Sequence, residues 1–313
     1  MTSKQTQEPN VTRIDVLLAR GTTTSFEFFP PKTDEGEAYL RRTLTDLEPL
    51  RPSFASVTYG AGGSTRERTH QLVIDMLRHT SLVPMAHLTT VSHHRHELAS
   101  LLARYRAEGV QNILALRGDP PRDGPAPFYE LAHAVDLVEL ARETGGEGFA
   151  IGVAAHPEGH PQAGSIAEDR RHLATKLAAA DFGVTQFFFR VEDYLAMVED
   201  LAALGCDTPV IPGVMPVTDV RQVERFAQLS GAAMPVALAD RLHAVRDRPE
   251  QVRRIGVEVG TELCRALLDA GAPGLHFFTL NRSTATREIH ANLGLTPHGA
   301  SGIAAADDRD RRT

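Results

Sequence analysis

Short apolar segments and longer amphipathic segments alternate along the chain. Apolar runs of about four to eight residues predict buried strands, and apolar positions that recur about every three or four residues predict helices. The eight predicted strands are residues 24–28, 54–58, 84–89, 112–116, 150–155, 183–189, 209–212 and 275–280. The helices predicted to follow them are residues 35–50, 66–78, 97–108, 128–144, 166–180, 191–204, 220–229 and 284–293, and one extra helix is predicted at 250–270.

The predicted strands are apolar along nearly their whole length, as at residues 113–116 and 187–189. Such strands are buried on both faces, which is typical of a parallel sheet covered by helices. Repeated strand–helix units in one chain of 313 residues therefore predict an α/β fold, a closed (β/α)8 TIM barrel with one extra helix before the last strand. An open doubly wound sheet is the alternative.

The domain organisation predicted from the chain is simple. We expect a flexible N-terminal segment with a lead-in helix at 1–20, a single catalytic domain at 21–296 and a disordered polar tail at 297–313. In a barrel of this kind the functional groups lie at the carboxyl ends of the strands and in the loops after them.

Charge and cysteine content exclude several classes of protein. With 33 Lys and Arg against 40 Asp and Glu, the net charge of −7 excludes a basic nucleic-acid binder. A leader segment and an apolar run long enough for a membrane span are not expected, so we predict a cytoplasmic protein. Cys206 and Cys264 are the two cysteines, too few for a disulfide framework or a cysteine-based metal site.

The first strand contains a carboxylate, Glu27, among phenylalanines. A lone buried charge is expensive, so Glu27 either pairs with a buried arginine or has its pKa raised by desolvation, so that it can act as a general acid near neutral pH. The second strand ends in Thr58 and Tyr59 and runs into a glycine-rich turn that contains Ala61. Because this turn lacks a phosphate-loop pattern, it fits either ligand contact or a simple turn with a Ser64–Glu67 capping box.

The fourth strand ends in Arg117, Gly118 and Asp119, followed by two prolines that stiffen the exit. These charges fit a preorganised site or, alternatively, a surface ion pair between Arg117 and Asp119. His87 in the third strand is placed to meet a ligand, as are His156 and His160 after the fifth.

Other polar residues have a structural and a functional reading. His93, His94 and His96 fit a solvated helix start better than a metal site. Gln186, in an aromatic strand, suits contact with a heterocycle or a satisfied core position. Asp169 and Lys176 fit a surface ion pair or contacts to phosphate or ribose.

Eight sequence strings, each at a predicted strand or strand end, together resemble the methylenetetrahydrofolate reductase family over nearly the whole chain. They are TTSFEFFPPK, SVTYGAGGSTR, HLTT, LRGDPP, AAHPEGHP, TQFFF, IPGVMPV and HFFTLNRST. The resemblance implies a TIM barrel that binds FAD, takes hydride from NADH or NADPH, and reduces 5,10-methylenetetrahydrofolate to 5-methyltetrahydrofolate in a ping-pong cycle. It also implies a homo-oligomer.

The resemblance also implies roles for individual residues. Glu27 corresponds to the family's general acid and Asp119 to a carboxylate that stabilises a cationic folate intermediate, while Gln186, Arg282 and Thr58 correspond to substrate contacts. The residues that correspond to FAD contacts are Thr58, Tyr59, Ala61, His87, Arg117, Gly118, Asp119, His156, His160, Asp169 and Lys176.

Three features depart from the family pattern. His156 stands where an aromatic residue is common, which predicts weaker, pH-dependent stacking; Val220 replaces an aromatic residue; and one residue is missing between Lys176 and Asp181. The open alternatives are a flavin-free reductase that moves hydride directly, a non-catalytic folate- or flavin-binding barrel, and a metal-dependent barrel hydrolase.

Overall fold

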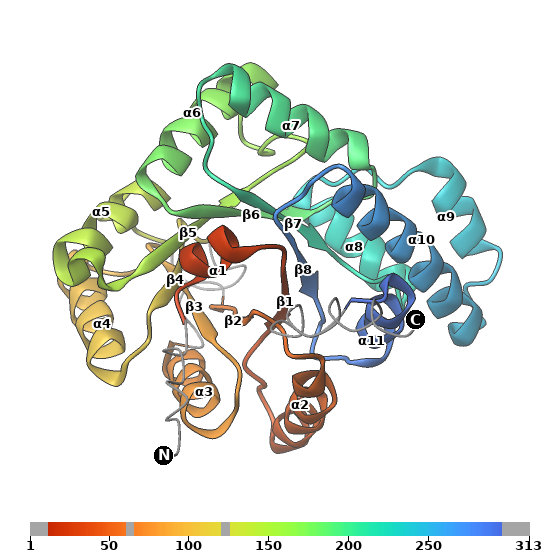
Figure 1. Cartoon of the computed structure of the whole chain (residues 1–313), viewed down its shortest axis with the longest axis horizontal. Helices are drawn as coiled ribbons and strands as arrows, with labels where there is room; N and C mark the ends of the chain where they lie inside the picture. Colours follow the sequence, from red (N-terminus) through yellow and green to blue (C-terminus); the bar gives the residue numbers. More distant parts are fainter. Residues whose placement is uncertain (1–11, 61–65, 120–125, 296–313) are drawn as a thin grey trace, which may run out of the picture.

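The computed structural model describes residues 12–60, 66–119 and 126–295. Eight parallel strands close into a barrel in sequence order, with β8 paired to β1 (Figure 1). The strands are β1 (Thr23–Phe28), β2 (Phe54–Val57), β3 (Pro84–Thr89), β4 (Asn112–Leu116), β5 (Ala150–Ala155), β6 (Phe182–Phe187), β7 (Val210–Val214) and β8 (Gly274–Phe278). The predicted TIM barrel is therefore confirmed.

Helices surround the barrel in sequence order. They are α2 (Asp34–Leu47), α3 (Arg66–His79), α4 (Arg95–Glu108), α5 (Ala134–Gly145), α6 (Ile166–Ala179), α7 (Val191–Ala203), α8 (Val220–Ser230), α9 (Val236–His243), α10 (Pro249–Asp269) and α11 (Thr284–Leu293), and the short 3-10 helices η1 (Glu48–Leu50) and η3 (Gly146–Gly148) follow α2 and α5. Within the described residues, no helix is both long and apolar enough to cross a membrane.

Alternation along the strands separates two environments. Phe26 and Phe28 are fully buried and pack outward against the helices, in a cluster with residues such as Leu40 of α2. Ser25 and Glu27, at the alternate positions of β1, therefore face the barrel interior. The same alternation directs the polar side chains of β2, β3 and β8 toward the middle of the barrel.

The amino end of the barrel is closed by helix α1 (Ile14–Arg20), which lies across the strands in Figure 1. Ile14 is fully buried in a cluster with interior residues that include Phe54, Met85 and Phe182. Asn112, the first residue of β4, fixes this helix because its Oδ1 accepts from Ile14 N at 2.9 Å and its Nδ2 donates to Thr12 O at 2.8 Å.

Two helix predictions differ from the structure. α5 begins at Ala134 rather than at Phe128. Phe128 lies in an irregular segment whose carbonyl accepts from Ser92 N at 2.9 Å, so this stretch belongs to the loops above the barrel. The extra helix before the last strand is present as α10, but the preceding helix α9 was not predicted. The described residues begin at Thr12 and end at Leu295, so the predicted tail 297–313 and most of segment 1–20 lie outside them.

Candidate active site

Glu27 projects from β1 into the barrel toward two histidines. Its Oε2 lies 3.5 Å from His87 Nε2 and 3.6 Å from His276 Nε2, and the side chain is 17% exposed. Among the described residues the carboxylate thus has histidine neighbours, and the buried arginine that was one of the two alternatives is not beside it. The interior neighbours of the carboxylate come instead from β3 and β8, and an imidazole, unlike an arginine, can be neutral near pH 7.

His276 was missed by the sequence analysis, although it is a fully buried residue of β8. Its Nδ1 is hydrogen-bonded to Ser25 Oγ at 2.8 Å, and its Nε2 to Ser56 Oγ at 3.3 Å. The ring also stacks on Phe54, with 5.9 Å between the ring centroids. One signal in the sequence could have revealed it. His276 is a polar residue within an otherwise apolar strand, which is the feature by which Glu27 was recognised.

Strand β3 presents to the interior two polar atoms that have no hydrogen-bond partner among the described residues. His87 Nε2 and Thr89 Oγ1 are both buried and without a hydrogen bond. Burial lowers the pKa of His87 to about 4, so its ring is neutral near pH 7. Buried polar groups in native proteins are normally paired, so these atoms fit a polar ligand held above the centre of the barrel.

The loop after β2 is tied to the loop after β3 through Tyr59 and His93. Tyr59 OH lies 3.0 Å from His93 Nε2, and His93 Nδ1 lies 2.7 Å from Val91 O. His93 is 1% exposed, so the predicted solvated face holds for His94 and His96 but is wrong for His93. Thr58 is half-buried at the end of β2, and its N donates to Phe28 O at 2.8 Å.

Residues 61–65 of that loop, which include Ala61 and Ser64, lie outside the described residues. Neither the predicted contact of Ala61 nor the predicted capping box at Ser64 is therefore described.

The loop after β4 depends on a glycine. Gly118 has φ of +80°, and a Cβ at this position would lie 2.6 Å from Val91 Cγ1 and 2.8 Å from Thr89 Cβ. Arg117, directly before it, donates to Gln162 Oε1 at 2.9 Å and lies over the ring of Tyr129. Arg117 thus contacts the loop after β5 rather than Asp119, which is exposed. The alternative of an Arg117–Asp119 surface pair is not what the structure contains.

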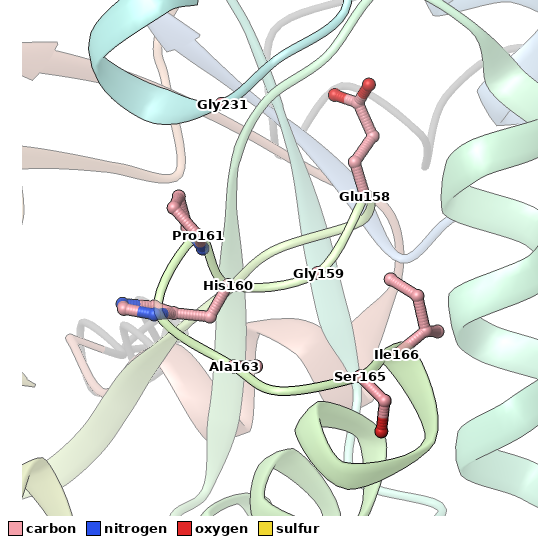
Figure 2. A pocket seen from close by; sticks show the side chains of 8 residues that line it. All are labelled: Glu158, Gly159, His160, Pro161, Ala163, Ser165, Ile166 and Gly231. Atoms are coloured by element: carbon pink, nitrogen blue, oxygen red, sulfur yellow. The ribbon is translucent and has the colours of Figure 1, made fainter.

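The loop after β5 carries His156 and His160, whose rings meet edge to face at 4.8 Å. A pocket of about 300 Å³ adjoins this loop, and Figure 2 shows Glu158, His160 and Ser165 around it, with Gly231 from the end of α8 on the far side. Burial lowers the pKa of His156 to about 3, with further lowering from the neighbouring positive charges. The ring is therefore neutral near pH 7, and the weaker, pH-dependent stacking expected at His156 stays a prediction.

Asp169 and Lys176 of α6 do not form the surface ion pair considered above. Asp169 is 9% exposed and pairs with Arg170 at 3.1 Å, while Lys176 Nζ donates to Ala154 O of β5. Burial lowers the pKa of Lys176 to about 8, although Asp169 partly opposes this. Both residues thus lie against the barrel.

Asp181 holds the segment in which one residue was predicted to be missing. Its carboxylate accepts from Arg142 Nη2 at 2.7 Å and from Ile151 N at 2.6 Å. The connection between α6 and β6 is therefore anchored to β5 and α5.

Gln186 lies near the end of β6, beside a register irregularity against β7. Its Oε1 accepts from Phe187 N at 3.0 Å, which leaves the amide NH2 group to donate elsewhere. Val220, at the start of α8, is buried in a cluster with Phe187 and Met215, so it fills apolar space rather than facing a ligand.

Arg282 follows two residues in left-handed conformation, Leu280 with φ of +52° and Asn281 with φ of +56°. Asn281 Oδ1 accepts from Phe29 N at 3.0 Å, and its Nδ2 donates to Phe29 O at 2.8 Å. This clasp joins the end of β8 to the end of β1, and so fixes exposed Arg282 relative to the strand that carries Glu27. Sequence analysis missed Asn281, whose role depends on this pairing between distant segments.

Across residues 12–60, 66–119 and 126–295, His, Cys, Asp and Glu side chains form no group of three that could hold a metal ion. The site is instead an acid facing two imidazoles inside the barrel, with polar and charged groups at the carboxyl ends of the strands. Fold and site together define a (β/α)8 barrel of the enzyme type.

Comparison with known proteins identifies the family. The model of the family described as methylenetetrahydrofolate reductase matches residues 13–294. The 5,10-methylenetetrahydrofolate reductases of Pectobacterium carotovorum and Escherichia coli K12 are 36% and 37% identical, each over 87% of this chain, and over 90% and 91% of their own lengths. This chain therefore belongs to the methylenetetrahydrofolate reductase family, whose members are oxidoreductases that act on CH–NH groups.

A plant relative and a solved structure were also found. "Methylenetetrahydrofolate reductase (NADH) 1" of Zea mays is 36% identical over 90% of this chain and 50% of its own length. A Clostridium thermocellum protein solved with two copies of 5-methyl-5,6,7,8-tetrahydrofolic acid superposes with a TM-score of 0.67 at 13% identity, covering 90% of this chain and 97% of its own. At that identity the likeness concerns the fold alone.

Proposed function

We propose that this protein reduces 5,10-methylenetetrahydrofolate to 5-methyltetrahydrofolate with NADH or NADPH as the hydride donor and FAD as the carrier, in a ping-pong order. Family membership supports the overall reaction. The observation that carries the mechanistic part is the inward-facing carboxyl of Glu27 between two buried histidines. A non-catalytic binding barrel has no use for such an acid.

Glu27 is proposed as the general acid. Methylenetetrahydrofolate must open its five-membered ring before hydride can reach the methylene carbon, and protonation of the ring nitrogen that leaves this carbon makes the opening possible. The other nitrogen then forms a cationic iminium, which accepts the hydride and becomes the N-methyl group. His87, whose Nε2 lies 3.5 Å from the carboxyl, is neutral near pH 7 and so brings no positive charge next to Glu27.

Asp119 is proposed to stabilise the cationic iminium electrostatically. Its exposure at the end of β4 fits contact with a bound ligand. Gln186 and Arg282 are proposed to orient the folate, and Thr58 to contact both ligands. Gln186 retains free amide donors, and Arg282 is held on the same side of the barrel as Glu27 by the Asn281 clasp.

The residues present fit FAD. His87 Nε2 lacks a hydrogen bond among the described residues, the left-handed turn at Gly118 packs against Val91 and Thr89, and Arg117 and Lys176 supply positive charge. Tyr59, His156, His160 and Asp169 complete the proposed cofactor contacts. When bound, FAD would supply a group that accepts hydride from the nicotinamide nucleotide and gives it to the folate, and the protein supplies placement and electrostatics.

An anaerobic visible spectrum of the purified protein tests this proposal. Addition of NADH should bleach a flavin band, and addition of methylenetetrahydrofolate should then restore it. If the protein binds no FAD after reconstitution but still consumes NADH in the presence of the folate, hydride moves directly and the FAD assignments are wrong. If neither ligand changes the spectrum or NADH concentration, the barrel only binds.

A further inference from the structure

A buried arginine lies beneath the loop after β5. Arg170 is in α6 and 4% exposed, which is unusual for this residue type. Its Nη1 donates to His156 O at 3.0 Å and to Asp169 Oδ2 at 3.1 Å. Its Nη2 donates to Pro157 O at 2.5 Å and its Nε to Asp200 Oδ2 at 3.3 Å. The guanidinium thus donates to acceptors from the loop, from α6 and from α7.

The acceptors of Arg170 have a common place in the site. His156 and Pro157 begin the loop that carries His160 and lines the pocket in Figure 2, and Asp169 is the buried carboxylate of α6. The fourth acceptor, Asp200, has a side chain that is 50% exposed and anchors the guanidinium on its outer side. The guanidinium of arginine is planar and its donors point in fixed directions, so it can serve all four acceptors at once. The ammonium group of lysine cannot.

Arg170 also changes the charge available at the site. The negative charge of Asp169 acts on Lys176 and raises the pKa of its ammonium group. An Asp169 with no other partner would therefore offset the positive charge of that lysine. Because Arg170 pairs with Asp169, the positive charge of Lys176 is left for an anionic ligand. The same guanidinium fixes the carbonyl of His156, which also accepts from Gly159 N at 3.0 Å and so closes the turn.

We propose that Arg170 is a positioning residue for the cofactor: it clamps the loop that carries His156 and His160, and it pairs with Asp169 so that Lys176 can meet the FAD diphosphate. This inference rests on the proposed use of FAD. Arg170 touches neither the substrate nor the reacting atoms, and it acts through the loop and through Asp169.

The test compares Arg170→Met with Arg171→Met in the full chain. Arg171 is the neighbouring, exposed arginine, so the control removes the same charge from the same helix. We expect Arg170→Met to raise the FAD dissociation constant by about 10- to 100-fold, which is the usual effect of removing a residue that orients a binding residue. Flavin fluorescence on the folded apoprotein measures this constant. Arg171→Met should stay within about twofold of wild type.

Hydrogen exchange of the apoprotein separates the clamp from general stability. The amides of Gly159 and Ala163, which donate to His156 O and His160 O, should exchange faster in Arg170→Met, while amides of β1 to β4 should not. Uniformly faster exchange with an unchanged FAD dissociation constant would mean that Arg170 serves stability alone, and would overturn the inference.

Arg170→Lys keeps the inference testable if the methionine variant does not fold. It retains the charge but not the fork, so FAD binding should remain weaker than in wild type. Full recovery of FAD affinity in Arg170→Lys would overturn the clamp. Failure of the wild type to bind FAD would instead contradict the proposed function, and the role of Arg170 toward FAD with it.

Discussion

Glu27 and His87 face each other inside the barrel, with Glu27 Oε2 3.5 Å from His87 Nε2. Burial lowers the pKa of His87 to about 4, so near pH 7 the carboxyl of Glu27 faces a neutral ring from β3 rather than a cation. This relationship leads to two predictions, one for catalysis and one for stability.

Glu27→Gln should separate the two half-reactions. NADH-dependent reduction of bound FAD should remain near the wild-type rate, because no proton is required from Glu27 in that half. Reduction of methylenetetrahydrofolate should fall by about 10²- to 10⁴-fold, the usual contribution of a general acid. Stopped-flow spectra of each half-reaction measure this, with Glu199→Gln on the exposed side of α7 as the control. Equal loss in both halves would contradict the assigned role.

His87 should make the fold sensitive to acid. Between about pH 6.5 and 4 the unfolded chain binds a proton at His87 that the folded barrel does not bind, so the free energy of unfolding decreases as the pH falls. The contribution is at most about 1.4 kcal/mol per pH unit. His87→Gln should reduce this slope in urea unfolding at pH 7, 6 and 5, and exposed His79→Gln should not. Identical slopes in all three proteins would show that His87 titrates normally in the fold.

Gly118→Ala should disturb the loop that carries Arg117 and Asp119. The added Cβ meets Val91 and Thr89 at a φ of +80°, whereas Gly271 has nearly the same φ, +83°, and nothing within 4 Å of a Cβ. Gly271→Ala should therefore cost only the backbone strain, about 1 kcal/mol, and Gly118→Ala about 1 to 3 kcal/mol more. Urea unfolding compares them, and kcat/KM should fall only for Gly118→Ala. Similar losses of stability in the two variants would mean that the loop relaxes freely.

Asn281→Gly tests the clasp between β1 and β8. Glycine accepts the left-handed conformation but loses both hydrogen bonds to Phe29, which should cost about 1 to 3 kcal/mol. We also expect the KM for folate to rise more than the KM for NADH, because the clasp orders the strand ends that carry Glu27 and Arg282. A loss of stability with both KM values unchanged would restrict the clasp to folding.

The barrel could be predicted because its strands are buried on both faces. Residues 113–116 of β4 form an uninterrupted apolar run, and the ends of all eight strands lie within two residues of the predicted ends. The start of α5 and the short helix α9 were less predictable. Their positions depend on tertiary contacts, such as the hydrogen bond from Ser92 N to Phe128 O, that leave no periodic pattern in the sequence.

Several residues of the site could be predicted from the sequence, but the contacts between them could not. Glu27 stood out as a charge in an apolar strand, but its neighbours come from β3 and β8, and sequence does not show which side chains meet across a closed barrel. His93 was assigned to a solvated helix start for the same reason, since its partner Tyr59 lies at the end of another strand. Arg170 was not singled out in the sequence, because its partners at residues 156–157 belong to another segment.

Helix α1, which closes the amino end of the barrel, also limits how a ligand can reach the interior. Ile14 and the apolar side chains packed on it fill the barrel interior at its amino end. A ligand that reaches Glu27 therefore enters from the carboxyl end of the strands. A nicotinamide nucleotide and a folate would then both approach Glu27 from the same side of the barrel. A helix of seven residues, α1, thus determines the side of the barrel from which ligands can approach the acid.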